Sequence, residues 1–157
     1  MVHLAWSAII WLLVLILIPV QRIKQLWLVG AISFCLLFIV NFIFVQLRYY
    51  QFYNAILPIG GVPILHLIGG AGGGILLMNW MQRNHLYNIV LIFFFSGLLS
   101  LSALIHIYYG AMVHSTSFTH LEEFVLNIAG LSVLVLVSLA IIGEERIYEG
   151  DKMRFIK

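Results

Sequence analysis

Residues 55–81 read AILPIGGVPILHLIGGAGGGILLMNWM, and this stretch decides the fold. It holds two of the chain's three prolines, seven of its thirteen glycines and one histidine, but no charged residue. Proline and glycine interrupt its first nine residues, so we expect an irregular entry segment over residues 55–63. The eighteen residues that follow, 64–81, are apolar and just long enough for one membrane-spanning helix, because a helix rises about 1.5 Å per residue.

The composition is that of a membrane protein. Hydrophobic residues make up 63% of the 157 residues and charged residues 9%, against about 45–50% and about 25% in soluble domains. A soluble fold of this size cannot bury so much apolar surface, whereas lipid tails accept it. The formal charge of +2 is spread along the chain and forms no basic patch, so we expect no nucleic-acid partner. The single cysteine, Cys35, excludes an internal disulfide and a cysteine-based zinc site.

Four more apolar segments accompany the central one. The sequence therefore predicts one all-α domain, a polytopic membrane protein built as a compact bundle of five transmembrane helices in contact with the lipid bilayer. The predicted spans cover about residues 4–20, 26–47, 64–81, 89–113 and 124–143, and a tail follows over residues 144–157.

Lysine and arginine are distributed unevenly between the two sides of such a bundle. Five spans put the termini on opposite sides, and seven of the eight Lys and Arg residues then fall on the side of the tail, leaving Arg48 on the other. Short loops rich in Lys and Arg stay in the cytoplasm. We therefore expect a multi-pass protein of the cell (inner) membrane with its N-terminus outside and its C-terminus in the cytoplasm. The basic end of the tail, residues 152–157, either lies on the anionic inner leaflet, contacts a partner or is solvated.

Small residues predict where the helices touch. Gly69 and Gly73 are four residues apart, as are Gly70 and Gly74, and this spacing lets two membrane helices approach closely. The spacing matches no phosphate-binding fingerprint, so it favours helix packing over a phosphate cradle. Small and polar residues also share one face in three other spans. The residues predicted to pack helices or line a pocket are Asn41, His66, Gly69, Gly70, Gly73, Gly74, Ser100 and Asn127.

Histidines and carboxylates gather on the predicted outer side. Imidazole and carboxylate suit divalent transition metals, and histidine titrates near neutral pH, so these residues could form an outward-facing metal or proton site. Alternatively they are solvated, and the two glutamates only begin the fifth helix behind a cap at Ser117 or Thr119. The spacing matches no established ligand motif. The metal candidates are His106, His114, His120, Glu122 and Glu123.

No catalytic residue stands out, because the sequence shows neither a nucleophile–base pair nor carboxylates spaced for acid–base work, and it implies no particular cofactor. We therefore expect a non-enzymatic membrane protein that acts through a membrane-protein partner, as an accessory or assembly subunit, or through a homo-oligomer. The alternative is a small-molecule, metal or proton-responsive binder or transporter component that uses the outward-facing histidines. An enzyme acting on lipid ranks last.

Overall fold

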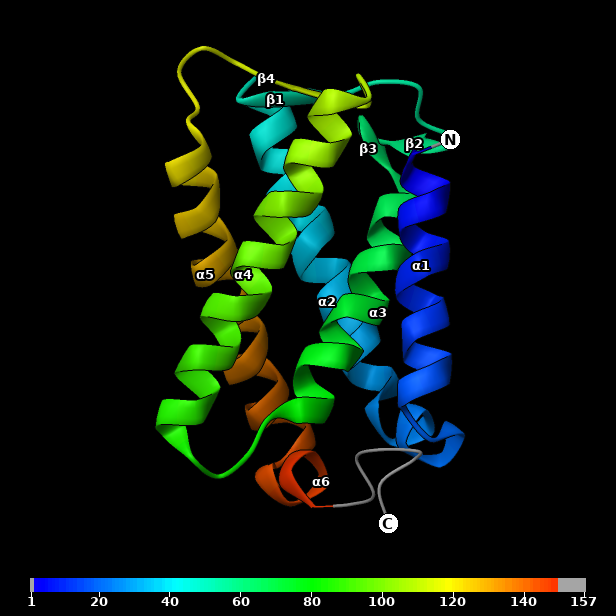
Figure 1. Ribbon diagram of the computed structural model, residues 1–157, viewed down its shortest axis with the longest axis vertical. Helices are drawn as coiled ribbons and strands as arrows, with labels where there is room; N and C mark the ends of the chain where they lie inside the picture. The colour runs from blue at the N-terminus through cyan, green and yellow to red at the C-terminus, as the bar shows by residue number, and fades with distance from the viewer. Residues whose placement is uncertain (1, 150–157) are drawn as a thin grey trace.

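The structure of the protein is a computed structural model that describes residues 2–149. Five long helices run side by side, with a short sixth helix at one end of the bundle and the strands at the other, where α1 begins (Figure 1). We call these ends the α6 end and the sheet end. The elements are α1 (Val2–Leu17), α2 (Val20–Gln46), β1 (Tyr50–Phe52), β2 (Pro58–Ile59), β3 (Val62–Pro63), α3 (Ile64–Trp80), α4 (His85–Tyr108), β4 (Met112–His114), α5 (His120–Ile142) and α6 (Glu144–Tyr148).

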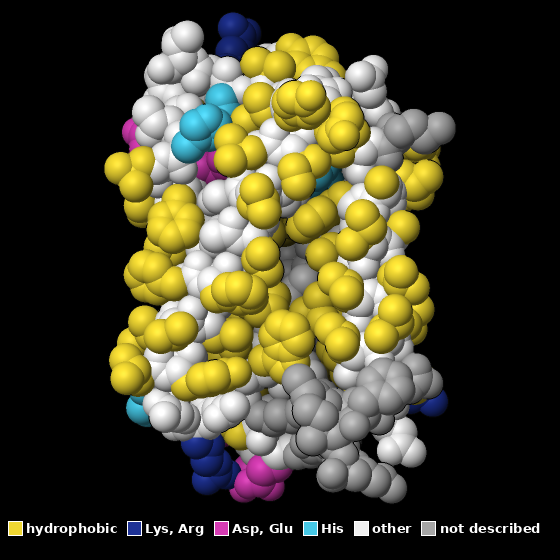
Figure 2. Space-filling view, viewed as in Figure 1, with side chains coloured by type: hydrophobic (Ala, Val, Ile, Leu, Met, Phe, Trp, Pro, Cys, Tyr) yellow, Lys and Arg dark blue, Asp and Glu magenta, His cyan; other side chains and the backbone are white. Residues whose placement is uncertain are grey.

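Three of the described helices are long and apolar enough to cross a membrane. They are α2, α4 and α5, with 27, 24 and 23 residues. The helices at the first and third predicted spans, α1 and α3, are also apolar but shorter, with 16 and 17 residues. Apolar side chains cover the side of the bundle, while charged side chains gather toward its two ends (Figure 2). The molecule is thus a helical bundle with three candidate membrane spans.

The first two helices meet earlier in the chain than the sequence predicts. Helix α1 ends at Leu17 and α2 begins at Val20, directly after Pro19. Because the residue before a proline is disfavoured in a helix, the break falls there. The predicted loop after residue 20 is therefore wrong, and Arg22 and Lys24 lie in the first turns of α2. By contrast, α3 begins at residue 64, where the sequence predicts its start.

The irregular entry to α3 is a small hairpin. Strands β2 and β3 pair antiparallel, and the two residues between them, Gly60 and Gly61, have φ values of 58° and 85°. Positive φ at both central positions is the geometry of a type I′ turn, which glycine adopts without strain.

A second pair of strands joins two distant connections of the chain. Strand β1 follows α2, β4 follows α4, and they pair antiparallel with Tyr50 opposite His114. The sequence does not predict these strands, because they are too short for an alternating pattern. They tie the α2–α3 connection to the α4–α5 connection at the sheet end.

Glycines let α3 lie close against both α1 and α2. A Cβ atom at Gly69 would lie 2.8 Å from Trp6 of α1, and one at Gly74 would lie 2.6 Å from Ser33 of α2. A Cβ atom at Gly70 would collide with Leu37 of α2, and one at Gly72 would lie 2.8 Å from Ile10 of α1. A Cβ at Gly73, however, would have nothing within 4 Å, so its predicted packing role is wrong. The helical rotation places this residue between the α1-facing and the α2-facing glycines.

At the α6 end a buried arginine anchors the last helix. The guanidinium of Arg22 donates to the backbone carbonyls of Arg146 and Ile147 and, at 3.3 Å, to that of Glu149. It also donates to the side chain of Asn79 in α3 at 3.4 Å. One side chain of α2 therefore holds both α3 and α6. The basic end of the predicted tail, residues 152–157, lies outside the described residues.

We expect Gly74→Ala to destabilise the bundle by about 1–2 kcal/mol and Gly73→Ala to stabilise it by up to about 1 kcal/mol. Both changes add a methyl group to α3 and improve its helix propensity equally. Only at Gly74 does the methyl group collide with a side chain, at Ser33 Cβ and Oγ, so α3 has to move away from α2. Denaturant titration in detergent micelles measures the difference, and equal stabilities would contradict the close approach.

Candidate metal centre

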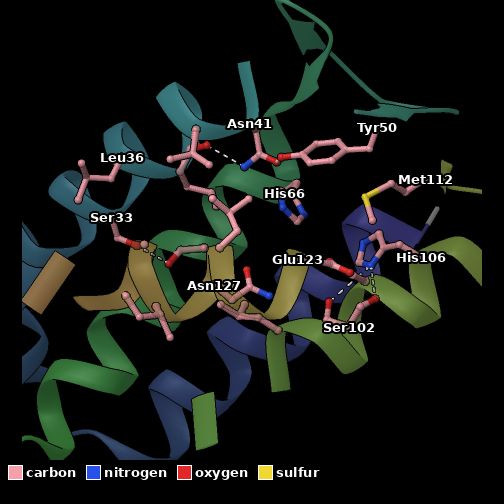
Figure 3. A pocket seen from close by; sticks show the side chains of 18 of the residues that line it. Ser33, Leu36, Asn41, Tyr50, His66, Ser102, His106, Met112, Glu123 and Asn127 are labelled. Carbon is pink, nitrogen blue, oxygen red and sulfur yellow. Dashed lines mark hydrogen bonds between the residues drawn. The ribbon is translucent and has the colours of Figure 1, made fainter. Parts of the chain in front are cut away.

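A cavity of about 140 Å³ lies inside the bundle near the sheet end. Residues of every long helix line it, and about half of them are leucine, valine, alanine or glycine. Its polar lining includes Asn41, His66, Glu123 and Asn127, which surround the same space (Figure 3). Ser100 lies behind this lining and accepts a hydrogen bond of 3.2 Å from Asn127 Nδ2. The structure thus brings the predicted polar residues of three spans to one cavity.

Three histidines from three helices meet at this cavity. His3 comes from α1, His66 from α3 and His106 from α4, and one ring nitrogen of each lies within 4.8 Å of the other two. The ring centroids of His3 and His106 are 5.0 Å apart, and those of His66 and His106 are 5.7 Å apart. His66 and His106 line the cavity directly. We call this set the three-histidine cluster.

A backbone contact fixes which nitrogen of His106 carries the proton. His106 Nδ1 lies 2.8 Å from the carbonyl oxygen of Ser102, one turn earlier in α4. A carbonyl oxygen only accepts, so Nδ1 is the protonated donor and Nε2 carries the free lone pair. Metal-binding histidines are commonly oriented in this way by a backbone carbonyl.

The cluster leaves several buried nitrogens without hydrogen-bond partners among the described residues. They include Nε2 of His106 and Nδ1 of His66, whereas backbone groups of Tyr53 and Ala111 interact with the imidazole of His3. His3 and His106 are each only 2% exposed. Because an unpaired buried polar group costs about 1–3 kcal/mol, converging lone pairs of this kind fit a ligand that accepts electron pairs.

A second group lies at the start of α5. His114 of β4, His120 and Glu123 each offer one ligand atom, and these atoms lie within 4.8 Å of one another. Glu123 Oε2 is 3.7 Å from His114 Nε2 and 3.8 Å from His120 Nδ1. We call this set the surface cluster, because His120 is 63% exposed.

The structure thus divides the metal candidates that the sequence places in one group. His106 belongs to the three-histidine cluster, separate from His114 and His120. Glu122 belongs to neither cluster, because its carboxylate accepts hydrogen bonds from the backbone N–H and the hydroxyl of Thr119. Thr119 in turn caps α5, which completes a capping box. Grouping all five candidates in one site is therefore wrong.

The site residues predicted from the sequence include neither His3, a member of the three-histidine cluster, nor Ser102, whose carbonyl orients the ring of His106. The available signal was depth, because His3 and His66 near the starts of α1 and α3, and His106 near the end of α4, all lie toward the sheet end of the bundle. Depth in the bundle does not reveal which faces of the helices turn toward one another, and the cluster forms only where the faces that carry the histidines meet.

Burial shifts the pKa values of His114 and of Tyr50, which lies opposite it in the sheet. It lowers the pKa of His114, and the neighbouring His120 lowers that pKa further, so His114 is neutral at neutral pH. Burial and the charge of Glu123 raise the pKa of Tyr50. The Tyr50 hydroxyl therefore stays protonated and donates to Asn41 Oδ1 at 2.8 Å.

No known protein family matches this chain, and neither a curated protein nor a solved structure matches it. The fold and the site define a helical bundle with candidate membrane spans and two clusters of side chains that could hold a metal ion.

We expect Tyr50→Phe to lower the free energy of unfolding by about 1–3 kcal/mol, because it leaves the buried oxygen of Asn41 without its donor. Tyr53→Phe is the matched control, since the hydroxyl of Tyr53 donates to Gln51 at the surface and its loss should cost almost nothing. Thermal unfolding followed by circular dichroism in detergent compares the two. Equal melting temperatures would argue against the Tyr50–Asn41 contact.

Proposed function

We propose that this protein is a non-enzymatic, multi-pass membrane protein that binds a divalent transition metal through His3, His66 and His106. The observation that supports it most is the convergence of buried imidazole nitrogens from three helices. A lone buried histidine is commonly satisfied by one neighbour, whereas here the Ser102 carbonyl pairs with Nδ1 of His106 and leaves its Nε2 free.

The donor set fits zinc, copper or nickel, which accept imidazole ligands. Two nitrogens that bind one tetrahedral ion at about 2.0–2.1 Å lie about 3.3 Å apart. The ring nitrogens here lie within 4.8 Å of one another, so side-chain movements of about 1 Å would bring them to this separation. Because two of the three histidines line the cavity, the fourth ligand position would face it.

Charge balance also supports the proposal. A divalent ion is costly to hold in apolar surroundings unless a negative group lies nearby. Glu123 is the one carboxylate among the described residues that line the cavity. It would supply the compensating charge without being a ligand of the three-histidine cluster.

All five long helices, in this proposal, cross the cell membrane. The sheet end holds Arg48, whereas Arg22, Lys24, Arg83 and Arg146 belong to segments at the α6 end (Figure 1). This asymmetry supports an outer sheet end and a cytoplasmic α6 end. The metal site would then open toward the outside, and a protein that holds an ion there would exchange it with a membrane partner.

We expect His66→Ala and His106→Ala to abolish the binding of one Zn²⁺ per chain. The measurement is a competition titration against a chromophoric chelator, with the purified full chain in detergent.

His85→Ala is the matched control, because this histidine is exposed at the start of α4 and belongs to the opposite end of the bundle. It should bind Zn²⁺ like the unaltered protein. An unchanged affinity in both His66→Ala and His106→Ala would refute the three-histidine site.

The orientation has its own test, with single cysteines in a Cys35→Ser background. A membrane-impermeant maleimide should label Tyr109→Cys, at the sheet end of α4, in intact cells. It should label Gln82→Cys, before α4, only after permeabilisation. The reverse pattern would invert the proposed orientation, and labelling of both in intact cells would mean that α4 does not cross.

A further inference from the structure

The surface cluster is built from two segments that the fold holds in place. His114 is the last residue of β4 and pairs with Tyr50 of β1, so the sheet fixes its position. His120 and Glu123 are three residues apart at the start of α5 and therefore share a face. The capping box of Thr119 and Glu122 fixes the start of this helix.

The distances within the surface cluster fit a shared ion better than a hydrogen bond. Glu123 Oε2 lies 3.7 Å from His114 Nε2 and 3.8 Å from His120 Nδ1. Both separations exceed those of a hydrogen bond. They are close to the roughly 3.3 Å between two atoms that bind one ion. Two imidazoles and one carboxylate are also a ligand set that zinc and ferrous iron accept.

The ligand atoms on the buried side of the surface cluster form no hydrogen bond with any described residue. Oε2 of Glu123 and both ring nitrogens of His114 are buried without a hydrogen-bond partner. The side chains of His114 and Glu123 are 9% and 11% exposed, whereas that of His120 is 63% exposed. The cluster is thus buried on one side and open to the surface on the other.

We infer that His114, His120 and Glu123 form a second divalent-metal site, which takes up the ion at the surface and passes it to the three-histidine cluster. The existence of this site is independent of the proposed function, while the transfer step rests on it.

Glu123 connects the two sites. Its side chain belongs to the surface cluster and also lines the cavity that reaches His66 and His106. An ion that leaves His114 and His120 can therefore keep a carboxylate beside it until imidazoles of the inner cluster replace those ligands. Glu123 offsets one of the ion's two positive charges along this path, which lowers the main cost of moving an ion through apolar surroundings.

The adjacent carboxylates provide a matched pair of variants. Glu123→Gln removes a ligand oxygen from the surface cluster, whereas Glu122→Gln keeps a side chain that can complete the capping box. The experiment counts Zn²⁺ per chain by elemental analysis and follows its uptake by the purified full chain in detergent. We expect two ions for the unaltered protein and for Glu122→Gln, but one ion, taken up more slowly, for Glu123→Gln and for the double variant His114→Ala, His120→Ala.

Removing the inner ligands separates this inference from the proposed function. The double variant His66→Ala, His106→Ala should retain one ion, which the further change Glu123→Gln removes. One ion in the unaltered protein that depends on His66 but not on His114 or Glu123 would overturn the second site and leave the proposed function intact. One ion that depends only on the surface cluster would overturn the proposed function and leave the second site intact. An unchanged rate of uptake in Glu123→Gln would overturn the transfer step.

Discussion

The close approach of α3 to both α1 and α2 is the constraint on which the rest of the structure depends. Within a membrane the hydrophobic effect does not drive helices together, so packing requires surfaces that fit closely. Gly69 and Gly72 bring α3 against α1, while Gly70 and Gly74 bring it against α2. The same geometry sets His66 beside His3, because His66 lies one turn before the first of these glycines. The glycine-rich helix α3 thus determines both how the helices pack and where the histidines meet.

The helices α4 and α5 pair with each other and close the other side of the cavity. The β1–β4 pairing holds them to the first three helices at the sheet end, and Arg22 links α2 to α6 at the opposite end. Between these two attachments the polar side chains of five helices face inward around a cavity. In the proposed membrane protein, this arrangement keeps the polar groups buried in protein and shielded from lipid.

Much of the fold follows from local patterns, and the site does not. The apolar segments, the start of α3 after Pro63 and the cap at Thr119 depend on residues close in the sequence. The meeting of His3 with His106 depends on the rotation of α1 and α4, and hydropathy carries no information about rotation when a helix is apolar all round. For the same reason the sequence grouped His106 with histidines that belong to a different cluster. Strands β1 and β4 were missed because tertiary pairing, rather than propensity, creates them.

Arg22 also has a consequence for how the chain is made. Its guanidinium is buried, and its main acceptors are carbonyls of residues 146–149, which are synthesised more than a hundred residues later. Until α6 arrives, this fixed positive charge lacks those acceptors, and an uncompensated charge strongly opposes burial. Full burial of Arg22 therefore has to wait until residues 146–149 have been made, so the docking of α6 completes the packing of the first helical hairpin.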